Sequence, residues 1–340
     1  MRGVKWRTSF RAPSPMPSTA TAARLAVLTA WLLFTTAAQA QAWPARPVRL
    51  IVPFTAGGSA DTLGRLVAQK LAESLKQSFI VENRPGAGGV IGSELVVKAA
   101  PDGYTLLVSG VASHCIAPAL ARNFPFDPLR DFTHIALFGG PPGVLVVHPG
   151  LPVRTLPGLI ALARSQPGRL AYGSPGNGTQ GHLIAELLKQ AAGIDIAHVP
   201  YRGASPAMAD LIAGHVRVAS TTLSTASAQI HAGKARALAV SSGVRVPDFP
   251  EVPTFAELGY TELVVSIWFS LSGPAAMPAD IVRQLNTEVR RALQFADVRS
   301  RLLPEGIEPG DLDPQSFTAF VAAEVKRWAP IVRASGAQAD

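Results

Sequence analysis

Three glycine-rich stretches contain the residues of this sequence with the clearest chemical potential. They are residues 54–61 (FTAGGSAD), 83–92 (NRPGAGGVIG) and 173–182 (GSPGNGTQGH). Glycine lets the backbone approach a ligand closely, and a helix that begins after such a loop presents unpaired N–H groups and the positive end of its dipole. The three stretches therefore predict anion-binding loops, and the alternative is that their glycines only form tight turns.

The third stretch also contains a literal G-x-G-x-x-G pattern at Gly176, Gly178 and Gly181, with Asp195 further along the chain. This spacing is typical of dinucleotide-binding loops. In that motif the acidic residue follows the second strand, whereas Asp195 precedes the strand expected at 197–200. A dinucleotide-dependent or hydrolytic secreted enzyme that uses this loop remains the alternative function.

Catalytic side chains are not arranged in a recognisable pattern. Ser174 does not lie in a G-x-S-x-G elbow, and the sequence places no carboxylate where it would orient His182. The single cysteine, Cys115, excludes a disulfide framework within the chain and a cysteine-based metal cluster, and we expect it to be buried. No two histidines have the i, i+4 spacing of a helical metal site. We predict no catalysis, no cofactor and no metal.

Three side chains near the loops have two or more interpretations each. Asp61 would stabilise the start of its own helix or contact an amine or hydroxyl group of a ligand. Arg202 would bind a carboxylate ligand or pair with a neighbouring acidic residue. His182 would pack or hydrogen-bond at its helix start, contact the ligand, or act as a base.

Alternating strand and helix patterns position these loops at the carboxyl ends of buried strands, where open α/β sheets bind ligands. The ranges expected for strands are 48–54, 79–82, 104–109, 134–138, 144–148, 170–173, 197–200, 216–220, 237–241 and 264–271. The ranges expected for helices are 61–76, 92–100, 155–165, 179–192, 205–213, 225–232, 279–293, 296–303 and 314–334. Thr179 is expected to cap the N-terminus of its helix.

This order predicts an α/β protein with two domains, each a mostly parallel sheet flanked by helices. A Gly/Pro cluster at 139–143 marks a crossing between the domains, and the last helices return to the first one. Domain 1 is expected to comprise residues 41–142 and 264–340, and domain 2 residues 143–263.

The first 40 residues have the composition of a cleaved secretory signal. Basic residues precede an apolar run, Leu25 to Phe34, which is too short to span a membrane, and the stretch ends in the A-x-A sequence before Gln41. We expect cleavage after Ala40 and a location in the periplasm, with Met16 as an alternative start to Met1. Five of the 31 Lys and Arg residues and none of the 23 Asp and Glu residues lie in this segment, which leaves a mature net charge of +3. This small charge does not predict a nucleic-acid partner.

The order of several short motifs resembles that of the Bug family, the extracytoplasmic substrate-binding components of tripartite tricarboxylate transporters. The likeness extends over essentially the whole mature chain. Its motifs are Trp43-Pro44, Pro53-Phe54, Gly57-Gly58 with Asp61, residues 82–89 (ENRPGAGG), 101–107 (PDGYTLL), Asp131-Phe132, 172–174 (YGS), Gly178-Thr179, His182-Leu183, 198–203 (HVPYRG), 233–240 (GKARALAV) and 252–259 (VPTFAELG).

The resemblance implies a periplasmic-binding-protein-like (type II) fold, in which two domains joined by a hinge close on a carboxylate in the cleft between them. It implies delivery to the membrane subunits of a tripartite transporter, or a report to a sensor kinase, and we expect a monomer. The loops and the resemblance together predict ligand contacts from Phe54, Thr55, Ala56, Gly57, Gly58, Ser59, Asp61, Gly88, Ser109, Ser174, Gly176, Asn177, Gly178, Thr179, His182 and Arg202.

The sequence departs from the family pattern at three places. Arg217 stands where an acidic residue is usual, Ala117 where an asparagine is common, and Thr221-Thr222 where larger or acidic residues are frequent. Since an ammonium group needs an acidic partner, these changes favour a simple or aromatic carboxylate over an amino-acid ligand.

Overall fold

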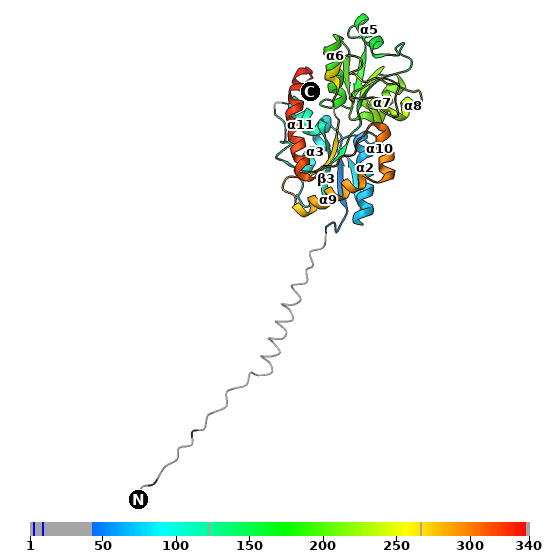
Figure 1. Ribbon diagram of the computed structural model, residues 1–340. Coiled ribbons are helices and arrows are strands. Elements are labelled where there is room, and N and C mark those ends of the chain that lie inside the picture. Colours follow the sequence, from blue (N-terminus) through cyan, green and yellow to red (C-terminus); the bar gives the residue numbers. More distant parts are fainter. Residues whose placement is uncertain (1–2, 4–8, 10–42, 122, 266, 338–340) are drawn as a thin grey trace. The chain divides into compact units, whose positions relative to one another are not determined.

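Two five-stranded sheets with flanking helices make up the chain from Arg46 onward, which forms one compact unit (Figure 1). This computed structural model describes residues 3, 9, 43–121, 123–265 and 267–337. The expected signal run and the cleavage site after Ala40 lie outside the described residues. Within these described ranges no helix has both the length and the apolar character needed to cross a membrane.

The first sheet has the strand order β2-β1-β3-β10-β4. Its strands are β1 (Val48–Val52), β2 (Phe79–Asn83), β3 (Thr105–Gly110), β4 (Phe132–Gly139) and β10 (Phe269–Pro274). Strand β1 is parallel to β2 and β3, whereas β10 is antiparallel to both β3 and β4. The helices that pack around this sheet are α2 (Ser59–Leu75), α3 (Val90–Val97), α9 (Ala279–Leu293), α10 (Ala296–Leu302) and α11 (Pro314–Ala334) (Figure 1).

The second sheet repeats this topology with the order β7-β6-β8-β5-β9. Its strands are β5 (Gly143–Val147), β6 (Ala171–Ser174), β7 (Ala197–Pro200), β8 (Val218–Thr222) and β9 (Arg236–Val240). Here β5 is the antiparallel strand. Its helices are α5 (Leu156–Ser165), α6 (Gln180–Ala192), α7 (Ala204–Ala213) and α8 (Leu223–His231). The expected two-domain α/β class with mostly parallel sheets is confirmed.

The chain leaves the first sheet after β4 and returns to it at β10. The expected domain boundaries, between residues 142 and 143 and between 263 and 264, lie in these two connections. The strand expected at 264–271 was placed too early, because pairing with β3 and β4 begins only at Phe269. The buried residues before it hydrogen-bond elsewhere: Val265 N donates to Ser241 O (3.2 Å) and Trp268 O accepts from Val111 N (3.2 Å).

Five short elements complete the fold, and the sequence pattern predicted none of them. They are η1 (Ala87–Gly89), the π-helix η2 (Ala112–Ile116), α4 (Ala117–Leu120), η3 (Thr261–Leu263) and η4 (Leu303–Glu305). All five residues of η2 are buried, so it has no polar face that would reveal a helical period. Cys115, on this element, is buried as expected, and burial raises the pKa of its thiol.

A buried carboxylate fastens α11 to the connection that precedes β10. Glu324 Oε2 accepts hydrogen bonds from Trp268 Nε1 (3.0 Å) and Trp328 Nε1 (2.9 Å). Replacing Glu324 with alanine would leave two buried indole N–H groups without an acceptor, so we expect a loss of about 3 kcal/mol in the free energy of unfolding, measured in urea. The exposed Glu262→Ala is the control, with an expected change below about 0.5 kcal/mol. An equal effect of both variants would contradict this role for Glu324.

Candidate functional site

The N-terminal ends of four helices converge on one small cavity, called here the inner cavity. Its volume is about 30 Å³. It is lined by Phe54, Gly58, Ser59, Ala60, Pro175, Thr179, Gln180, Ala204, Thr222 and Phe269. This set includes the first residue, or the residue just before it, of α2, α6, α7 and α8. Because the first N–H groups of a helix lack partners within the helix and carry the positive end of its dipole, this convergence favours an anion.

Hydrogen-bond donors around the inner cavity are only partly used by the protein itself. Thr179 Oγ1 caps α6 by accepting from His182 N (3.4 Å), as expected, whereas no side chain caps α2, α7 or α8. Gln180 is 5% exposed, and its Nε2 has no hydrogen-bond partner among the described residues. A buried amide donor without a partner costs free energy, so it indicates a group that accepts from it when a ligand binds.

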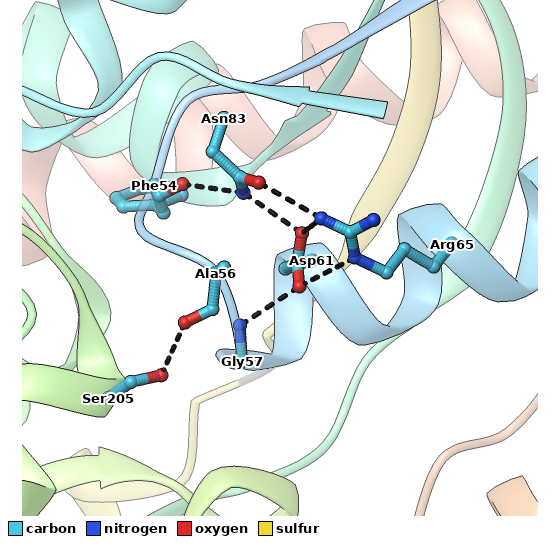
Figure 2. Close-up of polar contacts among 7 residues, drawn as sticks. All are labelled: Phe54, Ala56, Gly57, Asp61, Arg65, Asn83 and Ser205. Atoms are coloured by element: carbon cyan, nitrogen blue, oxygen red, sulfur yellow. Dashed lines mark hydrogen bonds and ion pairs between the residues drawn. The ribbon is translucent and has the colours of Figure 1, made fainter. Parts of the chain in front are cut away.

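Asp61 holds the first loop in place through hydrogen bonds (Figure 2). Its Oδ2 accepts from Gly57 N (2.9 Å) and its Oδ1 from Asn83 Nδ2 (2.9 Å), while Arg65 pairs with both oxygens. Asn83 Nδ2 also donates to Phe54 O (3.0 Å). Burial alone would raise the pKa of Asp61, but the hydrogen bonds from Arg65, Gly57 and Asn83 lower it below its ordinary value. Asp61 is therefore an ionised support for the loop and lines neither cavity described here.

Loops that follow strands of different sheets touch one another around the inner cavity. Ser205 Oγ donates to Ala56 O (2.9 Å), as Figure 2 shows, and Thr55 N donates to Arg202 O (3.4 Å). Deeper in, Ser59 Oγ hydrogen-bonds Thr222 Oγ1 (2.6 Å). These contacts join the start of α2, beside the first sheet, to the starts of α7 and α8, beside the second.

A larger outer cavity of about 430 Å³ adjoins the inner one. Phe54 and Pro175 line both cavities and therefore lie between them. The other residues that line the outer cavity are Gly86, Ala87, Gly88, Gly89, Val90, Ala117, Leu120, Ala121, Asn123, Phe124, Pro125, Gly176, Asn177, Gly178, Pro200, Tyr201 and Arg202. Its size lies in the range of cavities that bind small organic ligands.

Two close backbone approaches shape the outer cavity. A Cβ atom on Gly88 would lie 2.1 Å from Asn177 O, and one on Gly178 would lie 3.2 Å from Ala117 Cβ. Both glycines have positive φ, of 61° and 71°. The lack of a side chain therefore allows the second loop to meet the third at Gly88 and the third loop to approach Ala117 at Gly178.

The structure divides the predicted ligand contacts into three groups. Phe54, Gly58, Ser59 and Thr179 line the inner cavity, and Phe54, Gly88, Gly176, Asn177, Gly178 and Arg202 line the outer one. Thr55, Ala56, Gly57 and Asp61 shape the first loop without lining either cavity. Ser109, Ser174 and His182 line neither cavity.

Each member of the third group is engaged elsewhere. Ser109 Oγ hydrogen-bonds Ser270 and Ser272 of the neighbouring strand, both at 2.7 Å. His182 stacks on His198 with ring centroids 4.2 Å apart, and its Nδ1 accepts from Gly178 N (3.3 Å). The interpretation of His182 as a packing and hydrogen-bonding residue fits these contacts.

Ser174 and His198 lie at the distance of a nucleophile and its base beside the third loop. Ser174 Oγ lies 2.6 Å from His198 Nε2, and burial, with the nearby charges of His182 and Lys189, lowers the pKa of His198 to about 3. Ser174 is, however, completely buried, and its hydroxyl also accepts from Gly176 N (3.1 Å). In the described part of the chain no carboxylate orients His198, so this pair supports the third loop.

The glycines of the G-x-G-x-x-G pattern allow neighbouring backbone segments to approach closely. A Cβ atom on Gly181 would lie 2.2 Å from Ser220 O, and one on Gly176 would lie 2.7 Å from Tyr201 O. Asp195 precedes β7, so it lies at the amino-terminal ends of the parallel strands, whereas the loops lie at their carboxyl ends. Where the structure is described, no cluster of three His, Cys, Asp or Glu residues could hold a metal ion.

The three departures from the family pattern lie in different places. Ala117 lines the outer cavity, and Thr222 lines the inner one. Arg217 precedes β8, where its carbonyl accepts from His148 N (2.9 Å), and it lines neither cavity. The expectation that Arg217 bears on ligand class therefore has no support in the geometry.

Sequence reasoning missed Gln180, Ala204 and Phe269 of the inner cavity and Leu120, Ala121, Asn123, Phe124 and Pro125 of the outer one, and it noted Ala117 and Thr222 only as departures from the family pattern. Thr222 is the last residue of β8, and Ala204 begins the helix after β7, so the rule that ligands bind at the carboxyl ends of parallel strands could have found them. The other members depend on contacts between the two sheets, which no local pattern shows.

Comparisons with known proteins agree with this geometry. The family model described as "Tripartite tricarboxylate transporter family receptor" matches residues 63–337. Protein BugT of Bordetella pertussis is 39% identical over 300 residues, which cover 88% of this chain and 92% of that protein.

Two similar solved structures contain carboxylates. The R. palustris protein Rpa4515 with adipate is 37% identical, covers 87% of this chain and 99% of its own, and has a TM-score of 0.84. MatC from Rhodopseudomonas palustris with bound malate is 33% identical, covers 85% of this chain and 100% of its own, and has a TM-score of 0.82.

Proposed function

Because the chain belongs to the tripartite tricarboxylate transporter receptor family, we propose that it captures a small organic carboxylate and delivers it to the membrane subunits of such a transporter. The resemblance to the Bug family is thereby confirmed. Members of this family are periplasmic binding proteins. Cleavage after Ala40 and a monomeric state belong to the same proposal, and a report of the bound ligand to a sensor kinase is the alternative to delivery to a transporter.

The observation that carries the proposal is the convergence of four helix N-termini on the inner cavity. No charged side chain lines this cavity among the described residues, so the attraction for an anion comes from N–H groups, hydroxyls and the Gln180 amide. The cavity has room for one small group or about two waters. Adipate and malate in the two solved relatives support a carboxylate as that group.

Ligand capture requires the two sheets to separate and close again. We propose that domain 1 (41–142 and 264–340) and domain 2 (143–263) rotate about the two connections between the sheets. The contacts of Ser205 with Ala56 and of Ser59 with Thr222 would form on closure, and a ligand that touches both domains would favour the closed state. The residues predicted to contact the ligand would then all reach it only in the closed state.

The enzyme alternative has little physical support. Ser174 is buried, and the fingerprint glycines pack against neighbouring backbone. We therefore propose that the protein binds its ligand without changing it chemically. Activity on an ester, or stabilisation by NAD alone, would favour the alternative instead.

The test is titration calorimetry of the mature protein, unfolded and refolded to remove bound ligand, against a panel of carboxylates and NAD. The Gln180→Leu variant keeps the side-chain size and removes the amide donor. Since a hydrogen bond to a charged group contributes about 1.5–3 kcal/mol, we expect the affinity for a carboxylate to fall about tenfold or more. Gln190→Leu, an exposed change on the same helix, is the control and should bind as the unchanged protein does. Equal affinities for both variants would contradict the inner cavity as the carboxylate site.

A further inference from the structure

We infer that Glu305, a residue of domain 1, makes the closure of the two domains depend on pH. Its carboxylate faces domain 2 beside the connection that follows β4. Closure is favoured when this group is protonated and is weakened when it is ionised. The consequence for ligand affinity rests on the function proposed above, whereas the consequence for closure can be measured without a ligand.

The segment that begins with η4 touches both domain 2 and the connection after β4. Asp248 N donates to Pro304 O (3.3 Å), and η4 packs against α8. A Cβ atom on Gly306 would lie 3.2 Å from Val246 Cγ2 and 3.3 Å from Pro142 Cδ. Because these contacts join residues of different domains beside the proposed hinge, rotation of the domains must change them.

The carboxylate of Glu305 is poorly satisfied in this position. Its Oε2 is buried and has no hydrogen-bond partner among the described residues. The groups that act on it all belong to domain 2, and they are the Ser227 hydroxyl, the His231 imidazole and the Asp248 carboxylate. In the described part of the chain, neither a lysine or arginine nor any charged side chain of α10, on which η4 also packs, is among them. A buried oxygen without a donor costs more free energy in an ionised carboxylate than in a protonated one.

Two carboxylates from different domains therefore face each other at this contact. Burial raises the pKa of Glu305 above its ordinary value, the Ser227 hydroxyl and the charge of His231 offset part of the rise, and the negative charge of Asp248 adds to it. His231 Nε2 pairs with Asp248 Oδ2 (2.9 Å). The imidazole is thus held by Asp248 and compensates the Glu305 carboxylate only in part.

The direction of the pH effect follows from the burial of Glu305. Rotation that separates the domains would return its carboxylate to water, so the closed state has the higher pKa and binds a proton more tightly. Protonation therefore favours closure, and closure is lost progressively as the pH rises through the raised pKa of Glu305. Since a ligand that touches both domains binds the closed state, its affinity should fall over the same range of pH.

Glu305→Gln is the test variant, because glutamine has the size of the protonated acid and is neutral at every pH. Calorimetry with the tightest binder of the carboxylate panel compares the variant with the unchanged protein at a series of pH values from about 7.5 down to about 5, on both sides of the range in which a raised carboxyl pKa lies. We expect the variant to bind about three- to tenfold more tightly at the highest pH, because a difference of one in pKa changes the equilibrium about tenfold. The ratio should fall towards one as the pH is lowered. Protonation of the ligand affects both proteins alike and cancels in the ratio.

Glu308→Gln is the matched control, since it removes an equal charge from an exposed position in the same segment and should bind as the unchanged protein does. Asp248→Asn should strengthen binding at the highest pH by less than Glu305→Gln, because burial is the larger cause of the raised pKa. Thermal unfolding checks that each variant is folded.

Small-angle scattering without ligand measures closure directly. At the highest pH, unliganded Glu305→Gln should be more compact than the unchanged protein, and the two should become alike as the pH falls. Equal affinity and equal compactness at the highest pH, or a difference that does not change with pH, would overturn the role of Glu305. Failure of every carboxylate to bind would overturn the proposed function alone, because the scattering comparison would still decide the role of Glu305.

Discussion

Replacement of Gly88 by alanine is expected to weaken carboxylate binding about 100-fold, which corresponds to about 2.8 kcal/mol. The added Cβ atom would lie 2.1 Å from Asn177 O, a backbone atom of the third loop, so the second and third loops could no longer meet. Because the ligand is proposed to be held by loops of both domains, a protein that cannot close loses the contacts that one domain would contribute. Calorimetry with the best carboxylate measures the loss, and small-angle scattering should show compaction on ligand addition only in the unchanged protein.

A second glycine provides a control for backbone strain. Gly88 has φ of 61°, and Gly193, the residue that ends α6, has φ of 57°. Alanine at either position adopts a left-handed conformation at a cost of about 1–2 kcal/mol. A Cβ atom on Gly193 would meet nothing within 4 Å. Gly193→Ala should therefore lose a similar amount of stability and bind ligand normally. If both variants bound equally well, the contact between Gly88 and Asn177 would not limit closure.

The glycine-rich loops could be predicted from sequence because their signals are local. Residues 54–61 and 173–182 lie between a short apolar run and an amphipathic run, and the structure places a strand and a helix there in both cases. The helices begin slightly earlier than expected, at Ser59 instead of Asp61 for α2 and at Leu223 instead of Thr225 for α8. The residues before the first apolar position of a helix carry no periodic signal, so such ends are difficult to locate.

The residues that sequence reasoning missed depend on tertiary contacts. Apolar residues such as Val265 and Ile267 are buried in either a strand or a connection, and only the partners of their backbone distinguish the two. Ser174 and His198 are 24 positions apart, and they meet because β6 and β7 are adjacent and parallel. Gln180 resembles an ordinary first-turn residue in the sequence. Its significance comes from the cavity that Phe269 and Thr222 close from other parts of the chain.

The protein is expected to lose stability steeply as the pH falls from 6.5 to 4.5, because buried imidazoles cannot accept protons in the folded state. Burial, reinforced by the charge of the neighbouring His134, lowers the pKa of His114 well below its ordinary value. Burial lowers the pKa of His134 to about 4. The unfolded chain binds protons at these histidines below about pH 6.5, whereas the folded protein does not. Since the unfolded state then binds more protons, stability falls with pH by up to about 1.4 kcal/mol per pH unit for each imidazole.

Carboxylates with lowered pKa values change the stability of the protein over a different range of pH. Hydrogen bonds from Arg49 lower the pKa of Glu82 to about 2, so its stabilising contribution is complete above about pH 4.5 and is lost as the pH falls towards 2. Between pH 6.5 and 4.5 the slope therefore reports mainly the buried imidazoles. Two of them would together cost about 4 kcal/mol at pH 4.5, a large part of the stability of an ordinary domain.

Urea unfolding at a series of pH values tests this expectation. His134→Leu removes one buried imidazole at similar volume, and it should lower the slope between pH 6.5 and 4.5 by about 1.4 kcal/mol per pH unit, whatever its effect on stability at pH 7. Gln190→Leu, an exposed change that adds and removes no titratable group, is the control and should leave the slope unchanged. An unchanged slope in His134→Leu would mean that His134 is protonated in the folded protein, or that the acid-unfolded chain keeps it buried. Fluorescence of Trp268, whose ring centroid lies 6.4 Å from that of His114, would distinguish these two cases, because only the second leaves the emission native-like after unfolding.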